Sequence, residues 1–154
     1  ILSWGGKCKI FKLNVLSDDF SPISDIEINQ LYYFASPKIK ENRSLEFDID
    51  LYEKYFEYFV SGFERLYDSV SSSALISIFY PSTIFIEKNN KFFKEYIKSK
   101  SEGEDLCEKI SRNGYSKLIK PRLPRLLTDQ TTALLPSKYL DNYSTLLPYL
   151  IQMK

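Results

Sequence analysis

The sequence predicts an α+β domain in which one antiparallel sheet carries helices on both faces. Short runs rich in aromatic and β-branched residues recur along the chain, a long amphipathic pattern divides them, and helical patterns close the chain. At 154 residues the chain has the length of one domain with its own core. We therefore expect residues 1–154 to form one domain. Because the chain opens on Ile1 and shows no leader pattern, we expect it to be a piece of a longer protein.

Two strands are expected before the long helix. Within residues 7–16, Phe11, Leu13 and Val15 alternate with the polar Lys12 and Asn14, which is typical of a half-buried strand. A polar loop over 17–30 follows. The aromatic run 31–36 then favours a second strand that ends at Pro37.

The clearest pattern in the chain is a long amphipathic helix from Asp50 to Val70. Asp50 with Glu53 three residues later resembles a capping box, and the serines at 71–73 end the pattern. The apolar positions follow one another at steps of four and three: Tyr52, Phe56, Phe59, Phe63, Leu66 and Val70. We expect Phe56, Phe59, Phe63 and Leu66 to form the central stripe of the core.

Two further apolar runs follow the helix. Residues 74–80 and 82–88 are rich in β-forming residues and are separated by Pro81, which favours a hairpin over one bent strand. The run 91–97 is too short for its periodicity to distinguish a strand from a helical turn.

The last third of the chain is expected to be helix, connector and helix. A short helix is predicted over 103–114, where Asn113 and Gly114 supply the stop, and 120–127, with two prolines, reads as an extended connector. Residues 134–154 predict a closing helix with one buried stripe. Pro148 lies inside it and cannot donate to the carbonyl of Ser144, so we expect this helix to bend against a curved sheet. The residues expected to make that contact are Tyr143, Leu146, Leu147, Leu150 and Ile151.

No catalytic constellation is recognised. The chain contains no histidine, so no nucleophile has an imidazole base, and Cys8 and Cys107 stand alone. We therefore predict a domain without catalytic side-chain chemistry and without a cofactor or metal, in a reducing compartment. Three pairs of carboxylates are interpreted as helix caps or solvated charges: Asp18 with Asp19, Asp48 with Asp50, and Glu102 with Glu104.

Two stretches combine basic and apolar residues. In the first, Lys88, Lys91, Lys94, Lys98 and Lys100 surround Phe92, Phe93 and Tyr96; in the second, Lys117, Lys120, Arg122 and Arg125 surround Leu118, Leu123 and Leu126. Either stretch suits phosphate groups, and Lys88, Lys91, Lys94 and Lys98 are candidate contacts for an anionic membrane surface. The alternative, which the sequence favours, is a solvated lysine face with its aromatic residues turned into the core. Over the whole chain 21 basic residues nearly balance 20 acidic ones, so no overall charge attracts nucleic acid or membrane.

In element order and in three blocks, the chain resembles a longin domain of the Mon–Ccz type of Rab guanine-nucleotide exchange complexes, in particular the Ccz-type subunit. The blocks are FKLNVLSDDFSPISDIEINQLYYFASPKIKEN (11–42), YFVSGFERLYDSVSSS (58–73) and LLPSKYLDNYSTLLPYLIQMK (134–154). The resemblance implies a five-stranded antiparallel sheet with one helix on one face and two on the other. It also implies pairing with a second longin-domain subunit, binding of a Rab-family GTPase, and a cytoplasmic protein peripheral to endosomal or vacuolar membranes.

In a longin sheet the second and third strands lie at the edges, which here means 31–36 and 74–80. Because Pro37 closes the first of these, the resemblance makes 74–80 the expected docking edge for the partner. The expected partner interface combines this edge with the off-core face of the long helix: Tyr55, Tyr58, Arg65, Ala74, Ile76, Ser77, Ile78 and Tyr80. The alternative function is a non-enzymatic scaffold domain of a nuclear complex, in which the basic stretches contact nucleic acid.

Overall fold

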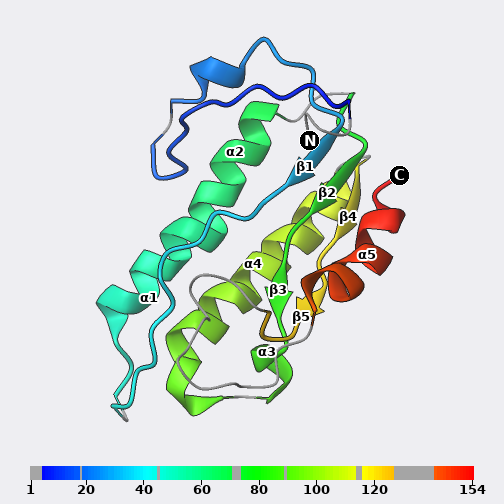
Figure 1. Cartoon of the computed structure of the whole chain (residues 1–154). Coiled ribbons are helices and arrows are strands. Elements are labelled where there is room, and N and C mark those ends of the chain that lie inside the picture. The colour runs from blue at the N-terminus through cyan, green and yellow to red at the C-terminus, as the bar shows by residue number, and fades with distance from the viewer. Residues whose placement is uncertain are drawn as a thin grey trace.

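Three parallel strands joined by helices form the centre of the fold (Figure 1). In a computed structural model, which describes residues 5–17, 19–44, 46–70, 74–88, 90–113, 116–126 and 141–154, the strand order is β1–β2–β4. The expected mixture of helices and strands is confirmed, but the predicted antiparallel sheet is wrong, since both strand pairs are parallel. A helix lies in each connection between these strands, and such a crossover returns the chain in its original direction. The three strands are β1 (Gln30–Tyr32), β2 (Ser77–Phe79) and β4 (Lys117–Ile119).

A second parallel ladder continues the first beyond two prolines. β3 (Ser82–Thr83) pairs with β5 (Arg122–Leu123), and Pro81 and Pro121 lie between the ladders at the same register. Pro121 has no N–H for the carbonyl of Tyr80, so one bond of the ladder is lost, and pairing resumes where the Ser82 N–H donates to the Pro121 carbonyl at 2.9 Å. The predicted hairpin is therefore wrong, because β2 and β3 run in the same direction.

The predicted long helix is confirmed, and it contains a π turn. Asp48 begins it by accepting a hydrogen bond from the Leu51 N–H at 2.9 Å, so the capping box predicted at Asp50 is wrong. The helix consists of α1 (Ile49–Phe56), the π turn η3 (Glu57–Ser61) and α2 (Gly62–Val70).

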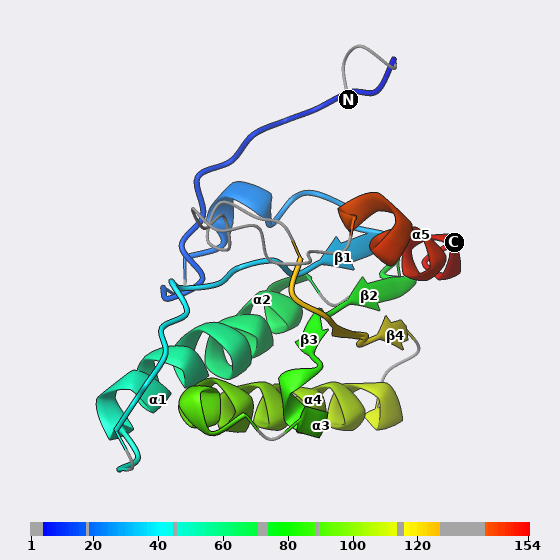
Figure 2. The ribbon, with the colours of Figure 1, turned by 60° about the horizontal axis from the view of Figure 1, so that its bottom comes forward.

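A second long helix packs beside the first, on the same face of the sheet (Figure 2). This helix, α4 (Lys94–Asn113), has 20 residues and follows the short helix α3 (Phe85–Lys88) and the 3₁₀ turn η4 (Lys91–Phe93). The run 91–97 is thus helical, and the helix predicted to begin at residue 103 begins earlier, at Lys94.

The C-terminal helix α5 (Asn142–Gln152) covers the opposite face of the sheet (Figure 2). Its contact stripe is Leu146 and Tyr149, which with Met153 pack against Phe79 and Ile119. Tyr143 and Ile151 are 71% and 58% exposed, so these two members of the predicted stripe are wrong, whereas the predicted contact of Leu146 is confirmed. Residues 134–140 of the predicted helix lie outside the described ranges. Asp141 caps α5 by accepting a hydrogen bond from the Ser144 N–H at 2.7 Å.

Pro148 is tolerated in α5 because it lies on the exposed side of the helix. The carbonyl that loses its intrahelical bond belongs to Ser144, which is also exposed, so water can satisfy it.

The main core lies between the sheet and the long helices. Phe59 and Phe63 are buried, and Phe56 and Leu66 pack partly buried beside the core, so the predicted stripe is confirmed. The Phe63 ring lies 4.8 Å from that of Tyr80, centroid to centroid.

The N-terminal segment, residues 5–17, contacts the core through Val15 but does not join a sheet. Residues 5–17 contain no strand, so the strand predicted over 7–16 is wrong. Val15 still packs against the core, and its carbonyl accepts a hydrogen bond from Arg65 Nη2 at 2.8 Å, whereas Ile10 is 92% exposed. The segment that carries the alternating apolar residues therefore has no neighbouring strand with which it pairs.

Candidate functional site

A pocket of about 690 Å³ lies at the carboxyl ends of β1, β3 and β5. Tyr33 and Phe34 follow β1, Thr83 ends β3 and Leu123 ends β5, and all four line the pocket. The π turn, α4 and α5 complete its wall. Open sheets of parallel strands bind ligands beyond the carboxyl ends of their strands, and small-molecule pockets typically measure roughly 300–1,000 Å³. We call this the carboxyl-end pocket.

The lining of the carboxyl-end pocket is mainly apolar, with a few polar groups. Its aromatic side chains come from five different segments: Tyr33, Phe34, Phe59, Phe85, Phe93 and Tyr96. The polar and charged residues are Ser36, Glu41, Ser82, Thr83, Lys100, Arg125 and Asn142. This composition fits an organic molecule that is mostly apolar and carries a small number of polar atoms.

Lys100 is the buried cationic side chain of the pocket. It is 5% exposed, and its Nζ donates a hydrogen bond to the Pro81 carbonyl at 2.7 Å. The same nitrogen lies 4.0 Å from the ring centroid of Phe59 and 4.6 Å from that of Tyr80. Burial lowers the pKa of Lys100 to about 7, although Cys107 and Glu104 act in the opposite direction. Near neutral pH, roughly half of the molecules therefore carry Lys100 as a free amine.

The β1–β2 ladder ends beside Pro81, which explains why the Pro81 carbonyl is available to the Lys100 amine. The ladder's last bond runs from the Tyr33 N–H to the Phe79 carbonyl at 2.9 Å. The next β2 donor facing β1 would be residue 81, and as a proline it has no N–H to offer. Beyond this point the chain after β1 leaves β2 (Figure 1), and the Pro81 carbonyl accepts from Lys100 instead.

The π turn η3 places the Phe59 ring against the amine. The carbonyls of Tyr58 and Phe59 accept hydrogen bonds from the hydroxyls of Tyr33 and Tyr80, the second at 2.9 Å. Two buried tyrosines therefore satisfy the backbone of the widened turn. Gly103 of α4 makes room for one of them, because a Cβ there would overlap the Tyr80 hydroxyl oxygen and lie 2.8 Å from its Cζ.

An ion pair between the buried Glu104 and the exposed Arg122 lies beside the pocket. Arg122 donates to both carboxylate oxygens of Glu104, at 2.9 and 2.7 Å, and the Ser82 hydroxyl donates to the same carboxylate. Burial raises the pKa of Glu104, but the bonds from Arg122 and Ser82 outweigh this effect and hold that pKa below its usual range. This network joins α4 to β3 and β5. The neighbouring Cys107 thiol is also buried, and burial raises its pKa to about 12, so it is protonated and unreactive.

The first basic stretch does not form one surface. Lys100 is buried, so its predicted place on the surface is wrong. Lys94 donates to the Ser44 carbonyl at 2.7 Å, and Lys98 pairs with Glu102 at 2.8 Å. Lys88 and Lys91 are exposed.

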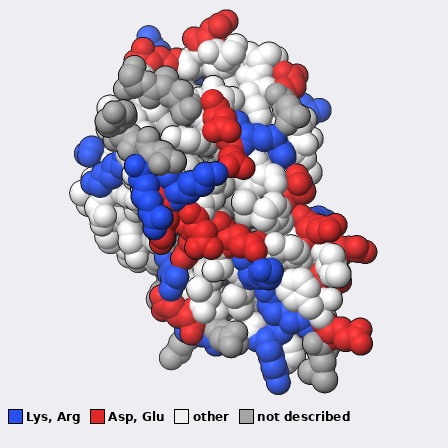
Figure 3. Space-filling view, turned by 180° about the vertical axis from the view of Figure 1, so that it is seen from behind, with Lys and Arg blue, Asp and Glu red and all other residues white. Residues whose placement is uncertain are grey.

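The second basic stretch is largely engaged within the chain. Arg122 pairs with Glu104 and with Glu87, Lys120 pairs with Glu108 at 2.9 Å, and Lys117 donates to the Gln152 carbonyl at 2.7 Å. On the face seen in Figure 3, acidic and basic side chains lie interspersed. Contact of either stretch with anionic lipid or nucleic acid stays a prediction.

The predicted docking edge is wrong, because β2 is the central strand of its sheet. Ser77, Ile78 and Tyr80 are fully buried, and Tyr55 is 1% exposed between the two long helices, with its hydroxyl accepting from the Lys40 N–H at 2.9 Å. These four side chains are covered by the chain itself and do not face a partner. Four of the predicted partner contacts are at least partly exposed, and their role in binding a partner stays a prediction: Tyr58, Arg65, Ala74 and Ile76.

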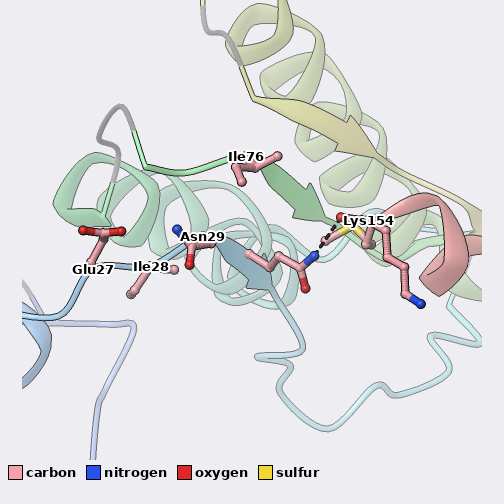
Figure 4. Close-up of a pocket in the computed structure, with 7 residues that line it drawn as sticks. Glu27, Ile28, Asn29, Ile76 and Lys154 are labelled. Atoms are coloured by element: carbon pink, nitrogen blue, oxygen red, sulfur yellow. Dashed lines mark hydrogen bonds between the residues drawn. The ribbon is translucent and has the colours of Figure 1, made fainter.

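A shallower pocket of about 550 Å³ lies at the amino ends of β1 and β2 (Figure 4). The Gln30 side-chain amide and the Ser77 hydroxyl both donate to the Met153 carbonyl at 2.8 Å. Glu27 and Lys154 lie at its opposite ends. These bonds fasten the end of α5 to the sheet, which gives the pocket a structural role.

The carboxylate pairs act mainly in structure. The expected cap is confirmed at Asp48, Glu102 accepts from the Tyr52 hydroxyl at 2.5 Å, and Asp18 lies outside the described residues. Glu104 differs from the expectation of a solvated charge, because it is 6% exposed and paired. Within the described ranges, no group of three or more potential ligand side chains is arranged to hold a metal ion. Nor does any helix in those ranges have the length and apolar character needed to cross a bilayer.

The sequence contained a signal for Lys100. Helical spacing counted back from Ile110 through Leu106 and Gly103 reaches Lys100 and then Tyr96, and all five lie on the inner side of α4. Because the helix was predicted to begin at residue 103, Lys100 was assigned to a surface stretch.

Comparisons with protein-family models, with curated proteins and with solved structures give no match. Fold and site together define a domain of helices and parallel strands with a ligand-sized pocket and a buried amine.

Proposed function

We propose that this domain binds a small, mainly apolar organic molecule in the carboxyl-end pocket, with the Lys100 amine as its polar anchor. The observation that carries the proposal is the position of one buried amine of lowered pKa in an aromatic pocket beyond the ends of parallel strands.

The side chains that line the pocket indicate the chemical class of the ligand. Aromatic side chains on several sides favour a flat ring or a branched apolar group, because rings bury large areas and stack. The Lys100 amine offers N–H groups beyond the one bonded to Pro81, and these suit a carbonyl or acidic oxygen. Arg125 at the pocket adds positive charge. The ligand we expect is therefore an aromatic or branched carbonyl compound or acid.

The test uses 1-anilinonaphthalene-8-sulfonate, an aromatic anion whose fluorescence rises in apolar sites. We expect saturable binding to the folded chain, with amide NMR shifts at Tyr33, Thr83 and Leu123 and none at Asn29 of the shallower pocket. Ser36→Trp should fill the pocket mouth and abolish binding. Ser111→Trp is the matched control, since Ser111 is exposed on α4 and does not line the pocket. Equal binding by both variants would remove the support for this function.

The second candidate is a partner-binding domain of a Rab guanine-nucleotide exchange complex, which pairs with a longin-domain subunit. It is favoured by β1, which lies at an edge of the described sheet and exposes 38% of Tyr32; Phe34, which follows β1, is 57% exposed. Because Tyr33 donates to β2, the N–H of Tyr32 points to the open side. The parallel strand order departs from the antiparallel sheet that the resemblance implies, so this candidate stands second.

The second candidate is tested by co-purification from cells that express the full-length protein. Tyr32→Pro removes the outward N–H without touching the β1–β2 ladder, and Tyr32→Thr is the control that keeps it. We expect the proline variant to lose a longin-domain partner that the threonine variant retains. Recovery of that partner with both variants would exclude pairing through this edge.

A further inference from the structure

We propose that the Lys100 amine forms a reversible imine with an aldehyde or ketone group of the molecule bound in the carboxyl-end pocket. This inference rests on the proposed function and adds the chemical class of the ligand and the atom that holds it.

The geometry leaves the reacting atom available. The amine is buried, and both groups nearest to it, Pro81 and Phe59, line the pocket together with Lys100. The bond to Pro81 uses one N–H as donor, so it fixes the nitrogen but leaves the lone pair of the neutral amine unused. A carbonyl carbon entering beside Phe59 can therefore approach a nitrogen that is already positioned.

The protonation state makes Lys100 differ from other lysines of the chain. With a pKa of about 7, roughly half of the Lys100 side chains are neutral at pH 7, against about 0.0004 of an ordinary lysine with a pKa near 10.4. The nucleophilic fraction is thus larger by a factor of about 10³. The groups that act on the amine are Glu104 and Cys107 of the same helix, and the neutral rings of Phe59 and Tyr80 face it from the other elements. Lysines of this kind are the ones that form Schiff bases in proteins.

The step needs no further reactant. The nitrogen lone pair forms the C–N bond as the carbonyl π electrons move to oxygen, and the resulting carbinolamine loses that oxygen as water. The water carries away the two hydrogens that the neutral amine held. Neither the carbonyl carbon nor the nitrogen changes its oxidation state, so no oxidant or reductant is consumed. Hydrolysis of the imine reverses the reaction.

Benzaldehyde with sodium cyanoborohydride tests the proposal, because the reductant converts an imine into a stable benzyl amine. The folded chain is treated at pH 7, and the benzylated lysine is located by peptide mass spectrometry. We expect Lys100 to be labelled at least about tenfold faster than Lys98, an exposed lysine of the same helix. Lys98→Met should leave the main label in place, Lys100→Met should remove it, and Ser36→Trp should slow labelling of Lys100 alone.

The outcomes separate this inference from the function on which it rests. Saturable binding of 1-anilinonaphthalene-8-sulfonate that slows the labelling of Lys100 supports both. Binding of that dye in the pocket, with Lys100 labelled no faster than Lys98, overturns the imine and leaves the ligand-binding function standing. Loss of both dye binding and selective labelling overturns both. Because selectivity is measured on the unmutated chain, a variant that fails to fold does not affect the result.

Discussion

Replacing Lys100 by Met should remove a pH dependence of stability that the buried amine gives to the wild-type chain. In the unfolded chain the amine has a pKa near 10.4, whereas in the folded chain burial lowers it to about 7. Between these values the unfolded state binds more protons, so the free energy of unfolding rises with pH across this window. Integrated from about pH 6 to pH 9, the gain is about 2–3 kcal/mol. The methionine variant lacks the titrating group and should show none of it.

The assay is urea unfolding of both chains at several pH values between 6 and 9, read as the difference between their free energies of unfolding. Cys107 also titrates, because burial raises its pKa to about 12, and it lowers stability as pH rises past the ordinary thiol value. Since both chains carry this thiol, its effect largely cancels in the difference. Lys98→Met is the control and should follow the wild type. If the wild-type and Lys100→Met curves run parallel over this range, the amine is not buried as described and the reasoning fails.

Three further predictions concern the packing around the site. Gly103→Ala should destabilise by about 1–3 kcal/mol, because its Cβ meets the Tyr80 ring, and Tyr80→Phe in the same chain should recover part of the loss in thermal unfolding. Phe63→Ala should cost about 3–5 kcal/mol through lost burial and a cavity, and a near wild-type melting curve would contradict the core assignment. Glu104 has a lowered pKa in the folded state, so its stabilising effect is present above the ordinary glutamate value and is lost as pH falls through the folded one; Glu104→Gln should remove that acid-sensitive component from unfolding curves.

The long helix and its core stripe were predictable because the signal was strong and local. Apolar steps of four and three over the 19 residues Tyr52–Val70 strongly favour a helix, and Phe59 and Phe63 are buried as expected. Tyr55 was misplaced because helical spacing defines the side facing the sheet and says nothing of a second helix. α4 covers Tyr55 from another direction, where its ring meets that of Tyr96 edge to face.

Strand direction was mispredicted for an identifiable reason. The element order strand, helix, strand, helix, strand itself favours parallel pairing, since each crossover contains a helix. Reading Pro81 as the turn of a hairpin and residues 7–16 as a strand obscured that order. A proline between two apolar runs is compatible with a turn or with one missing ladder bond. The choice depends on which strands lie beside residue 81, and those strands are distant in sequence.

The site itself depends on contacts that no local pattern contains. Pro81, the π turn and the buried amine are three departures from regular structure, and all three meet at Lys100. A methionine would fill a similar volume without the cost of desolvating an ammonium, and a donor at residue 81 would allow β1 to remain paired with β2 for longer. The chain instead carries an arrangement that costs stability near neutral pH, where the amine is partly charged. Costs of this kind concentrate at functional sites, because pre-positioned polar groups in apolar surroundings are what ligands recognise. The coincidence of the three features in one ligand-sized pocket therefore supports the proposal that this pocket binds a ligand.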